Sequence, residues 1–276
     1  MTRLLVDDHS TAQRERLERF KTTESVDVHC HCLPGVDDGP ATLGEALELC
    51  TALVEDGVTT AIATPHQLGR FDGRLTADDI RQAVVDLNAA LRAQGIPLAV
   101  EAGADVRVDE RIPALLDADR VLTLADSGKY LLLELPHDTF INIQPLLAEV
   151  VARGVTPILS HPERNTFLTR KPEAVIPWLE RGTLLQVTAA SLVGHFGPVA
   201  EQAAWHWLAT GAASLVASDA HDTAARRPCM TQATEAVARR LGEPAACRVC
   251  ILNPALLLAG KPVCASRHVF LHGKQR

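Results

Sequence analysis

The sequence is poor in aromatic residues and has no long apolar run. Phe, Trp and Tyr make up 4% of its 276 residues, so the composition indicates no aromatic groove for stacking. No apolar stretch is long enough to cross a membrane as a helix. The segment that begins at Met1 has too short an apolar region for a secretory signal peptide, so a cytoplasmic protein is the default expectation.

Positive charge is not in excess either. The chain has 27 basic and 34 acidic residues, a formal net charge of −7 and a pI near 5.9. A basic surface for binding nucleic acid is therefore not expected, although local basic sites are compatible with this balance.

The cysteine pattern argues against several kinds of site. The count is seven, and an odd number without a secretion signal argues against a disulfide framework. Cys247 and Cys250 form one CxxC with no second pair, so a zinc knuckle is not indicated. No cysteine is followed six residues later by arginine, which excludes the phosphate-binding loop of cysteine-dependent phosphatases.

Strand-like apolar runs alternate with segments of helical period along the chain. Strands are expected at 26–29, 58–63, 97–104, 129–135, 155–160, 184–188 and 214–218. Helices are expected at 43–55, 76–94, 109–117, 142–153, 172–181, 198–210, 228–241, 244–250 and 254–259, many of them ending at glycine. This alternation predicts βαβ units and a parallel sheet, and seven repeats favour a closed α/β barrel.

No linker interrupts this pattern, so a single domain at 25–262 is expected. Residues 1–24 would form an N-terminal extension, in which Ala12 to Phe20 are compatible with a short helix or with a mobile segment. Residues 263–276 would form a C-terminal tail.

A His-x-His pair follows the first expected strand. His29 and His31 are two residues apart, so on an extended segment both imidazoles point the same way. Asp37 and Asp38 follow on a loop bent by proline and glycine, and imidazole with carboxylate suits zinc, manganese or iron. Taken alone, the pattern is equally compatible with a polar loop that contains incidental histidines.

Polar residues also follow most of the other expected strands. The carboxyl ends of parallel barrel strands meet on one face, where such enzymes carry out chemistry. Glu134, inside an apolar run, needs a partner there, since burying an unpaired carboxylate is costly. The candidate ligands are too many for one ion and suit two or three bridged metals: His29, His31, Asp38, His66, Asp105, Glu134, His161, Asp219 and His221. The remaining histidines lie off this pattern and are interpreted as structural or surface residues. Among them, His137 and His195 are the best candidates for additional ligands, because both follow strand ends.

Arginines follow two of these candidate ligands. Arg164 comes shortly after His161, and Arg226 and Arg227 lie on the loop after His221. A guanidinium group matches the oxygens of a phosphate, although a surface ion pair is the alternative for any one arginine. Beside a site for several metals, phosphate binding is the favoured interpretation.

Taken together, these motifs resemble the polymerase and histidinol phosphatase (PHP) superfamily. They are most similar to its bacterial tyrosine-phosphatase branch from capsular and exopolysaccharide gene clusters. Order and spacing agree from about residue 26 to 258. The matching stretches are Asp27-Val-His-Cys-His, Leu33-Pro-Gly-Val-Asp-Asp-Gly, Thr64-Pro-His, Gly103-Ala-Asp, Leu133-Glu, Ser160-His-Pro-Glu-Arg, Gln186-Val-Thr-Ala-Ala-Ser-Leu, Ser218-Asp-Ala-His and Asn253-Pro.

The resemblance implies a distorted (β/α)7 barrel of the PHP fold with a three-metal site, often manganese, although iron, zinc or cobalt would also suit such ligands. His29, His31 and Asp219 would hold one metal, Asp105 would bridge it to a second that is held by Glu134 and His161, and Asp38, His66 and His221 would hold a third. Arg164 and Arg226 would contact the phosphate and act in catalysis with Asp219 and His221. Asp105 stands where many relatives have glutamate, so the bridge would shift or bind metal more weakly.

The implied reaction is hydrolysis of a phosphate monoester, most of all phosphotyrosine in a protein. By the same resemblance, the substrate would be the tyrosine-rich tail of a capsule-regulating kinase, and a homo-oligomer is allowed for. One alternative is a PHP phosphoesterase acting on a small molecule such as histidinol phosphate. Another is a non-catalytic, metal-binding regulator of polysaccharide machinery. Neither nucleic-acid binding nor membrane insertion is expected.

Overall fold

The structure is a computed structural model that describes residues 25–265. The expected N-terminal extension and the segment Ala12 to Phe20 lie outside the described residues, as does most of the expected tail. Within the described range, none of the helices has both the length and the apolar character required to cross a bilayer.

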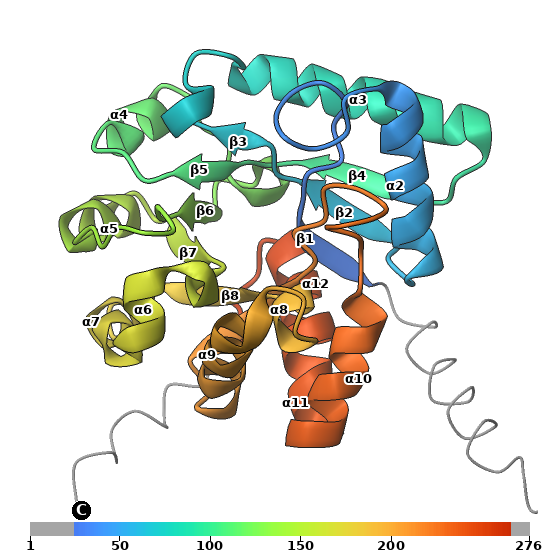
Figure 1. The fold of residues 1–276 in the computed structure, drawn as a ribbon. Helices are drawn as coiled ribbons and strands as arrows, with labels where there is room; N and C mark the ends of the chain where they lie inside the picture. The colour runs from blue at the N-terminus through green and yellow to red at the C-terminus, as the bar shows by residue number, and fades with distance from the viewer. Residues whose placement is uncertain (1–24, 266–276) are drawn as a thin grey trace, which may run out of the picture.

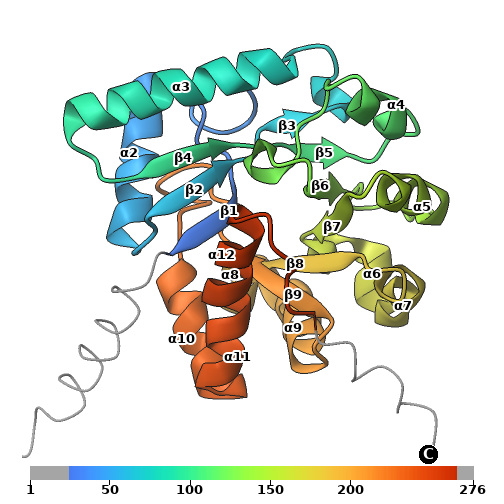
Figure 2. The same ribbon diagram turned by 180° about the vertical axis from the view of Figure 1, so that it is seen from behind.

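The described chain forms an α/β fold with parallel strands at its centre and helices around them (Figures 1 and 2). All the strand pairs are parallel. One sheet has the order β1-β2-β4 and the other the order β3-β5-β6-β7-β8-β9. The strands are β1 (Val26–Cys30), β2 (Thr60–Ala63), β3 (His66–Gln67), β4 (Ala99–Ala102), β5 (Asp105–Arg107), β6 (Tyr130–Glu134), β7 (Thr156–Ser160), β8 (Leu184–Thr188) and β9 (Ala213–Ala217).

Two short interruptions divide the strands between the sheets. β2 and β3 are separated by Thr64-Pro65, and β4 and β5 by Gly103-Ala104. Proline has no N–H to donate to a ladder, and a Cβ on Gly103 would lie 2.8 Å from Ile62 Cγ2. The sequence analysis predicted β2 and β4 but not β3 and β5, because strands of two or three residues are too short to show a period.

The first strand and the end of the last one are connected. Cys30 forms a parallel bridge with Ala220, whose carbonyl oxygen accepts a hydrogen bond from His31 N at 2.9 Å. The Asp27 carboxylate accepts hydrogen bonds from the backbone N–H of Ser218 at 2.9 Å and from its hydroxyl group. The carboxyl ends of β1 and β9 therefore lie side by side.

The helices lie outside the strands, with α3 packed along β4 (Figures 1 and 2). The α-helices are α2 (Leu43–Glu55), α3 (Ala77–Gln94), α4 (Ile112–Asp117), α5 (Gln144–Ala152), α6 (Thr166–Arg170), α7 (Ile176–Leu179), α8 (Ala189–Leu192), α9 (Gly197–Ala209), α10 (Met230–Leu241), α11 (Glu243–Cys247) and α12 (Asn253–Leu258). The other helical segments are the 3₁₀ turns η1 (Gly69–Phe71), η2 (Leu124–Asp126), η3 (Pro162–Arg164) and η4 (Pro172–Val175) and the π-helix η5 (Arg248–Leu252).

Local sequence explains where the longest helices begin and end. Thr42 and Thr76 each cap a helix through a reciprocal capping box, which satisfies N–H groups that have no partner inside α2 and α3. Gly95 ends α3 in the left-handed region at φ 67°, as a C-terminal glycine cap should. The sequence analysis missed α6 and α8, whose five and four residues are too few to define a helical period.

Side chains on the strands divide between two apolar clusters. On β6, Leu131 and Leu133 belong to the larger cluster, which includes many residues of the surrounding helices. Leu132 between them belongs to a smaller one, as expected when successive strand residues face opposite sides. This smaller inner cluster comprises the buried residues Val26, Val28, Ile62, Leu124, Tyr130, Leu132, Ile158, Leu184, Leu215, Ala217 and Leu257.

Candidate metal centre

All the predicted metal ligands lie together, at or after the carboxyl ends of β1, β6, β7 and β9 and at the first residues of β3 and β5. Each of them occurs in at least one group of three or four residues whose ligand atoms lie within 4.8 Å of one another. We call this set the ligand cluster; it comprises His29, His31, Asp38, His66, Asp105, Glu134, His161, Asp219 and His221. β1, β3, β5 and β6 carry some of them, while others lie on the loops that follow β1, β7 and β9.

His29, His31 and Asp219 form the first group. The Nε2 atoms of the two histidines are 3.2 Å apart, and Asp219 Oδ1 lies 3.3 and 3.5 Å from them. Nδ1 of His29 faces Gln186 Oε1 at 2.8 Å, and Nδ1 of His31 faces Asp37 Oδ2 at 2.6 Å. Both Nδ1 atoms face acceptors and therefore carry the protons, which leaves two Nε2 lone pairs directed at each other.

This first group fits a cation, because lone pairs and carboxylate oxygen would otherwise repel one another. Asp219 Oδ1 is buried and has no hydrogen-bond partner. Burial lowers the pKa of His29 to about 4 and that of His31 well below its usual value, so both rings are neutral near pH 7. Neutral imidazoles fixed by a hydrogen bond at the other nitrogen are the usual form of histidine ligands.

Asp105 lies at the middle of the ligand cluster. Its buried Oδ2 atom has no hydrogen-bond partner and is 3.7 Å from a ring nitrogen of each of His29, His66 and His161. Burial, with Glu134 next in importance, raises the pKa of Asp105 well above its usual value. A carboxylate that is central, buried and near other carboxylates needs a cation to remain ionised.

Asp105 is the residue that the family resemblance places between the first and the second metal. The structure groups Asp105 with His29 and His161, and also with His66 and Glu134. Glu134 lies 3.6 Å from His66 and 3.8 Å from His161, and burial raises its pKa. Asp105 is thus placed between neighbouring groups, as a bridging ligand would be.

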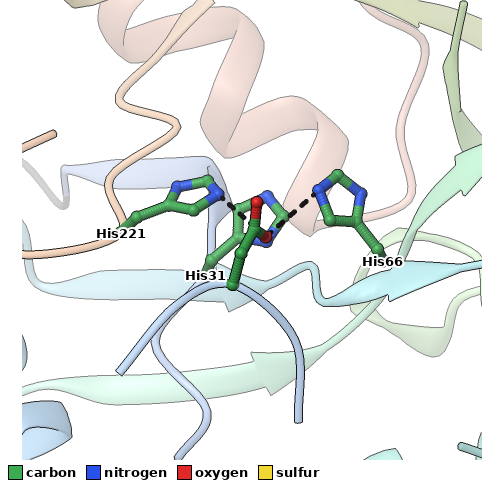
Figure 3. Close-up of side chains that lie close together, drawn as sticks. His31, His66 and His221 are labelled. Atoms are coloured by element: carbon green, nitrogen blue, oxygen red, sulfur yellow. Dashed lines mark ion pairs between the residues drawn. The ribbon is translucent and has the colours of Figure 1, made fainter. Parts of the chain in front are cut away.

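Asp38, His66 and His221 form the third group, which His31 joins (Figure 3). Asp38 Oδ1 lies 3.4 Å from His66 Nε2 and 3.5 Å from His221 Nε2. Nδ1 of His221 donates to the backbone oxygen of Asp219 at 3.0 Å, which leaves its buried Nε2 without a partner. This arrangement again directs ring nitrogens and a carboxylate oxygen to one point.

Two of the ligands adopt backbone conformations that are uncommon for residues other than glycine. His161 has φ 30° and Asp219 has φ 52°. Such conformations cost roughly 1–3 kcal/mol each and persist where surrounding contacts fix them, often at functional sites. His161 directly follows β7 and Asp219 lies two residues beyond the end of β9, so the unusual conformation accompanies the turn of the chain at the cluster.

Arg164 and Arg226 lie beside the cluster, as expected. Their guanidinium groups approach Asp219 Oδ2 at 2.6 and 2.8 Å. Burial opposes ionisation of Asp219, but Arg164 and the other neighbouring cations outweigh it and hold the pKa of Asp219 well below its usual value. Arg227 is not part of this arrangement, because it lines a separate surface cavity with Asp56.

A cavity of about 170 Å³ opens onto the ligand cluster. Its lining also includes residues that the sequence analysis did not identify, namely Leu68, Arg70, Phe71 and Arg107. Arg107 pairs with Glu134 at 3.0 Å, and Arg70 pairs with Asp38 at 2.6 Å. Arg107 was detectable in principle, since it lies two residues beyond Asp105 on β5 and therefore on the same face.

The remaining histidines and cysteines near the site have different environments. His137 lines the cavity and groups with Glu134 and His161, so one of the two named exceptions lies at the site. Burial, followed by Arg164, lowers the pKa of His137. His195 is exposed and belongs to none of the groups found among residues 25–265. Cys30 and Cys32 are fully buried and pack into the larger apolar cluster.

Comparison with protein families gives an independent result. The model of the capsular polysaccharide synthesis family CpsB/CapC matches residues 25–259. The tyrosine-protein phosphatase YwqE of Bacillus subtilis (strain 168) is 33% identical over 203 residues, covering 73% of this chain and 79% of YwqE. The tyrosine-protein phosphatase CpsB of Streptococcus pneumoniae is 26% identical over 240 residues, covering 84% and 98%.

Solved structures agree with this result. One chain from a crystallographic study of YwqE and CpsB, described there as unique metal-dependent tyrosine phosphatases, superposes with a TM-score of 0.83 and 30% identity, covering 87% of this chain and 96% of that one. A phosphotriesterase homology protein from Escherichia coli gives a TM-score of 0.55 at 13% identity, which supports the fold alone.

Proposed function

Since the chain belongs to the CpsB/CapC family of capsular polysaccharide synthesis proteins, we propose that it is a metal-dependent phosphatase that removes phosphate from tyrosine residues of proteins. The observation that carries this proposal is the ligand cluster beside a cavity that Arg164 and Arg226 also line. Relatives with the same overall structure are tyrosine phosphatases, and the residues here suit that chemistry.

We assign two to three divalent metal ions, with manganese favoured, to this cluster. His29, His31 and Asp219 would hold one ion, Asp105, Glu134 and His161 a second, and Asp38, His66 and His221 a third. The unpartnered buried oxygens of Asp105 and Asp219 and the unpartnered Nε2 of His221 support this assignment. When bound, such ions supply Lewis acidity toward the phosphoryl oxygens and toward the attacking water.

Arg164 and Arg226 would bind the phosphoryl group. Both guanidinium groups contact one oxygen of Asp219, so they are already oriented toward the cavity before substrate arrives. A guanidinium fork is complementary to phosphate oxygens and stabilises the charge that they carry in the transition state. The leaving group would be a tyrosine phenolate, whose conjugate acid has a pKa of about 10.

The fold and its surroundings complete the proposal. We infer that the two sheets are one distorted (β/α)7 barrel within a single domain at 25–262, with residues 1–24 and 263–276 as flanking segments. The connection between β1 and the end of β9 supports this view. A cytoplasmic location, a homo-oligomer and a polysaccharide-cluster tyrosine kinase as substrate stay predictions.

The test combines metal analysis with an activity assay. Protein from an unsupplemented culture is analysed for bound metals and assayed on a phosphotyrosine peptide. We expect two or three metals per chain, and hydrolysis that a chelator abolishes and vanadate does not. Metal with turnover of histidinol phosphate but not of the peptide would indicate a small-molecule phosphatase. Metal without any phosphatase activity would indicate a regulator, and failure to take up metal would refute the site.

A further inference from the structure

One wall of the cavity is formed by a backbone segment in an unusual conformation. Leu68, with φ 66° and ψ −168°, occupies a region that is essentially restricted to glycine. Gly69 follows with φ 56°, and a Cβ there would lie 2.9 Å from Arg107 Cγ. The segment therefore packs closely against Arg107 of β5, and Arg70 and Phe71, which follow it, line the cavity.

Phe71 lines the cavity and contacts two arginines, Arg70, which also lines it, and Arg74, which lies next to Phe71 outside the lining. Its ring stacks on the His66 ring, with centroids 5.2 Å apart and planes at 15°. The guanidinium carbons of Arg70 and Arg74 lie 4.6 and 5.1 Å from the Phe71 centroid. Cation–π contacts of this kind hold both cations in place before any ligand binds.

Arg70 and Arg74 are cations in addition to the two arginines proposed to bind the phosphoryl group. Arg164 and Arg226 already serve the phosphoryl position proposed above. Arg70 remains 66% exposed although it pairs with Asp38, so it has further hydrogen-bond donors available to solvent. The other nearby carboxylate on this segment, Asp72, pairs with Arg111 at 2.8 Å. The chain as a whole carries a net charge of −7, so this concentration of arginine at the cavity is local.

We propose that Arg70 and Arg74, supported by Phe71, form a second anion-binding subsite that recognises an acidic group next to the phosphorylated tyrosine. The subsite rests on the proposed tyrosine phosphatase function and adds a substrate class to it, namely acidic phosphopeptides. The acidic group is a carboxylate side chain or a second phosphate, since both accept paired hydrogen bonds from a guanidinium group.

The experiment measures a preference. Phosphotyrosine peptides of one length carry Glu, Lys or a second phosphotyrosine at the positions flanking the target, and kcat/KM is measured for each. We expect the wild-type enzyme to prefer the Glu peptide over the Lys peptide by about tenfold, as for one or two exposed charge pairs. This preference should reverse in Arg70→Glu and persist in Arg70→Lys. A larger preference for the doubly phosphorylated peptide would identify phosphate as the preferred neighbour.

Arg239→Glu is the matched control. Arg239 is 63% exposed and pairs with one carboxylate, Glu235, so the substitution has the same charge change away from the cavity. It should keep the wild-type preference. The preference should also shrink as salt is raised, because exposed charges are screened.

Two results would overturn the subsite. Equal kcat/KM for the Glu and Lys peptides in the wild-type enzyme would show that flanking charge is not read. An equal loss on all peptides in Arg70→Glu would show that Arg70 serves only the phosphoryl group or Asp38. Peptide affinities measured by fluorescence anisotropy test the subsite separately from the reaction. If no peptide is hydrolysed, the proposed function fails. A Kd that favours the Glu peptide in the wild type and the Lys peptide in Arg70→Glu would still support the subsite.

Discussion

The inner cluster and the ligand cluster share strands β1 and β6 and are built from opposite chemistry. Leu132 packs among apolar side chains, whereas Glu134, two residues further along β6, lies among imidazole rings. The inner cluster is stable without a ligand, because removing apolar side chains from water is favourable and requires no specific bonding partner. The ligand cluster leaves buried oxygen and nitrogen atoms without partners. One region therefore stabilises the protein as it is, and the other is incomplete without a cation.

The largest expected effect comes from removing one charge of the ligand cluster. Asp219→Asn keeps the shape of the side chain but removes the carboxylate that faces His29 and His31. We expect phosphatase activity to fall by at least about 10³-fold, with the far-UV circular dichroism spectrum unchanged. Asp119→Asn is the control, because Asp119 also has a positive φ and pairs with an arginine, Arg81, but is exposed. Full activity in Asp219→Asn would contradict the site.

Removing a side chain from the inner cluster should lower stability and leave activity in place. Leu132→Ala removes a fully buried side chain and should lower the free energy of unfolding by about 2–5 kcal/mol. Activity per folded molecule should remain close to that of the wild type, because the ligands are not touched. Leu252→Ala, at a leucine that is 45% exposed, should change stability by less than about 0.5 kcal/mol. A variant that is stable but inactive would show that the two regions are not separable.

Asp27 lies between the regions and makes the stability of the metal-free protein depend on pH. Burial raises its pKa from 3.8 to about 6, so the folded state favours the protonated form. Its stabilising contribution is complete below about pH 4 and is lost as pH rises toward 6, a change of up to about 3 kcal/mol. Urea unfolding with chelator at pH 4 to 7 should show a loss of stability that is larger by up to about 3 kcal/mol in the wild type than in Asp27→Asn, because the other buried titratable groups are common to both proteins. Substituting the exposed Asp86 should leave the pH dependence in place.

Metal binding should make the ligand cluster contribute to the stability of the folded protein, as the inner cluster already does. A divalent ion at 100 times its dissociation constant should stabilise the folded protein by about 2.7 kcal/mol. Thermal unfolding with and without manganese measures this shift, which should be much smaller in Asp219→Asn and preserved in Leu132→Ala. An equal shift in all three proteins would place the binding outside the ligand cluster.

The sequence was sufficient to predict the parallel α/β fold and to find residues that the structure brings together. His29, His66 and His161 were identifiable because each follows or ends a recognisable apolar strand. Arg70 and Phe71 were not, because they lie on a short turn whose contact with Asp38, 32 residues away, depends on the tertiary fold. Gln186 orients His29 across 157 residues, and no local pattern encodes that pairing.

The link between β1 and the end of β9 has a consequence for biosynthesis. Asp27 and Ser218 are 191 residues apart, and the first ligand group joins the same two segments. A ribosome-bound chain exposes its His-x-His pair long before Asp219 is made, so the complete ligand group cannot form until most of the protein has been synthesised. Contacts this distant also slow folding. We therefore expect metal capture to be a late event, which protects the growing chain from acquiring phosphatase activity before its fold is complete.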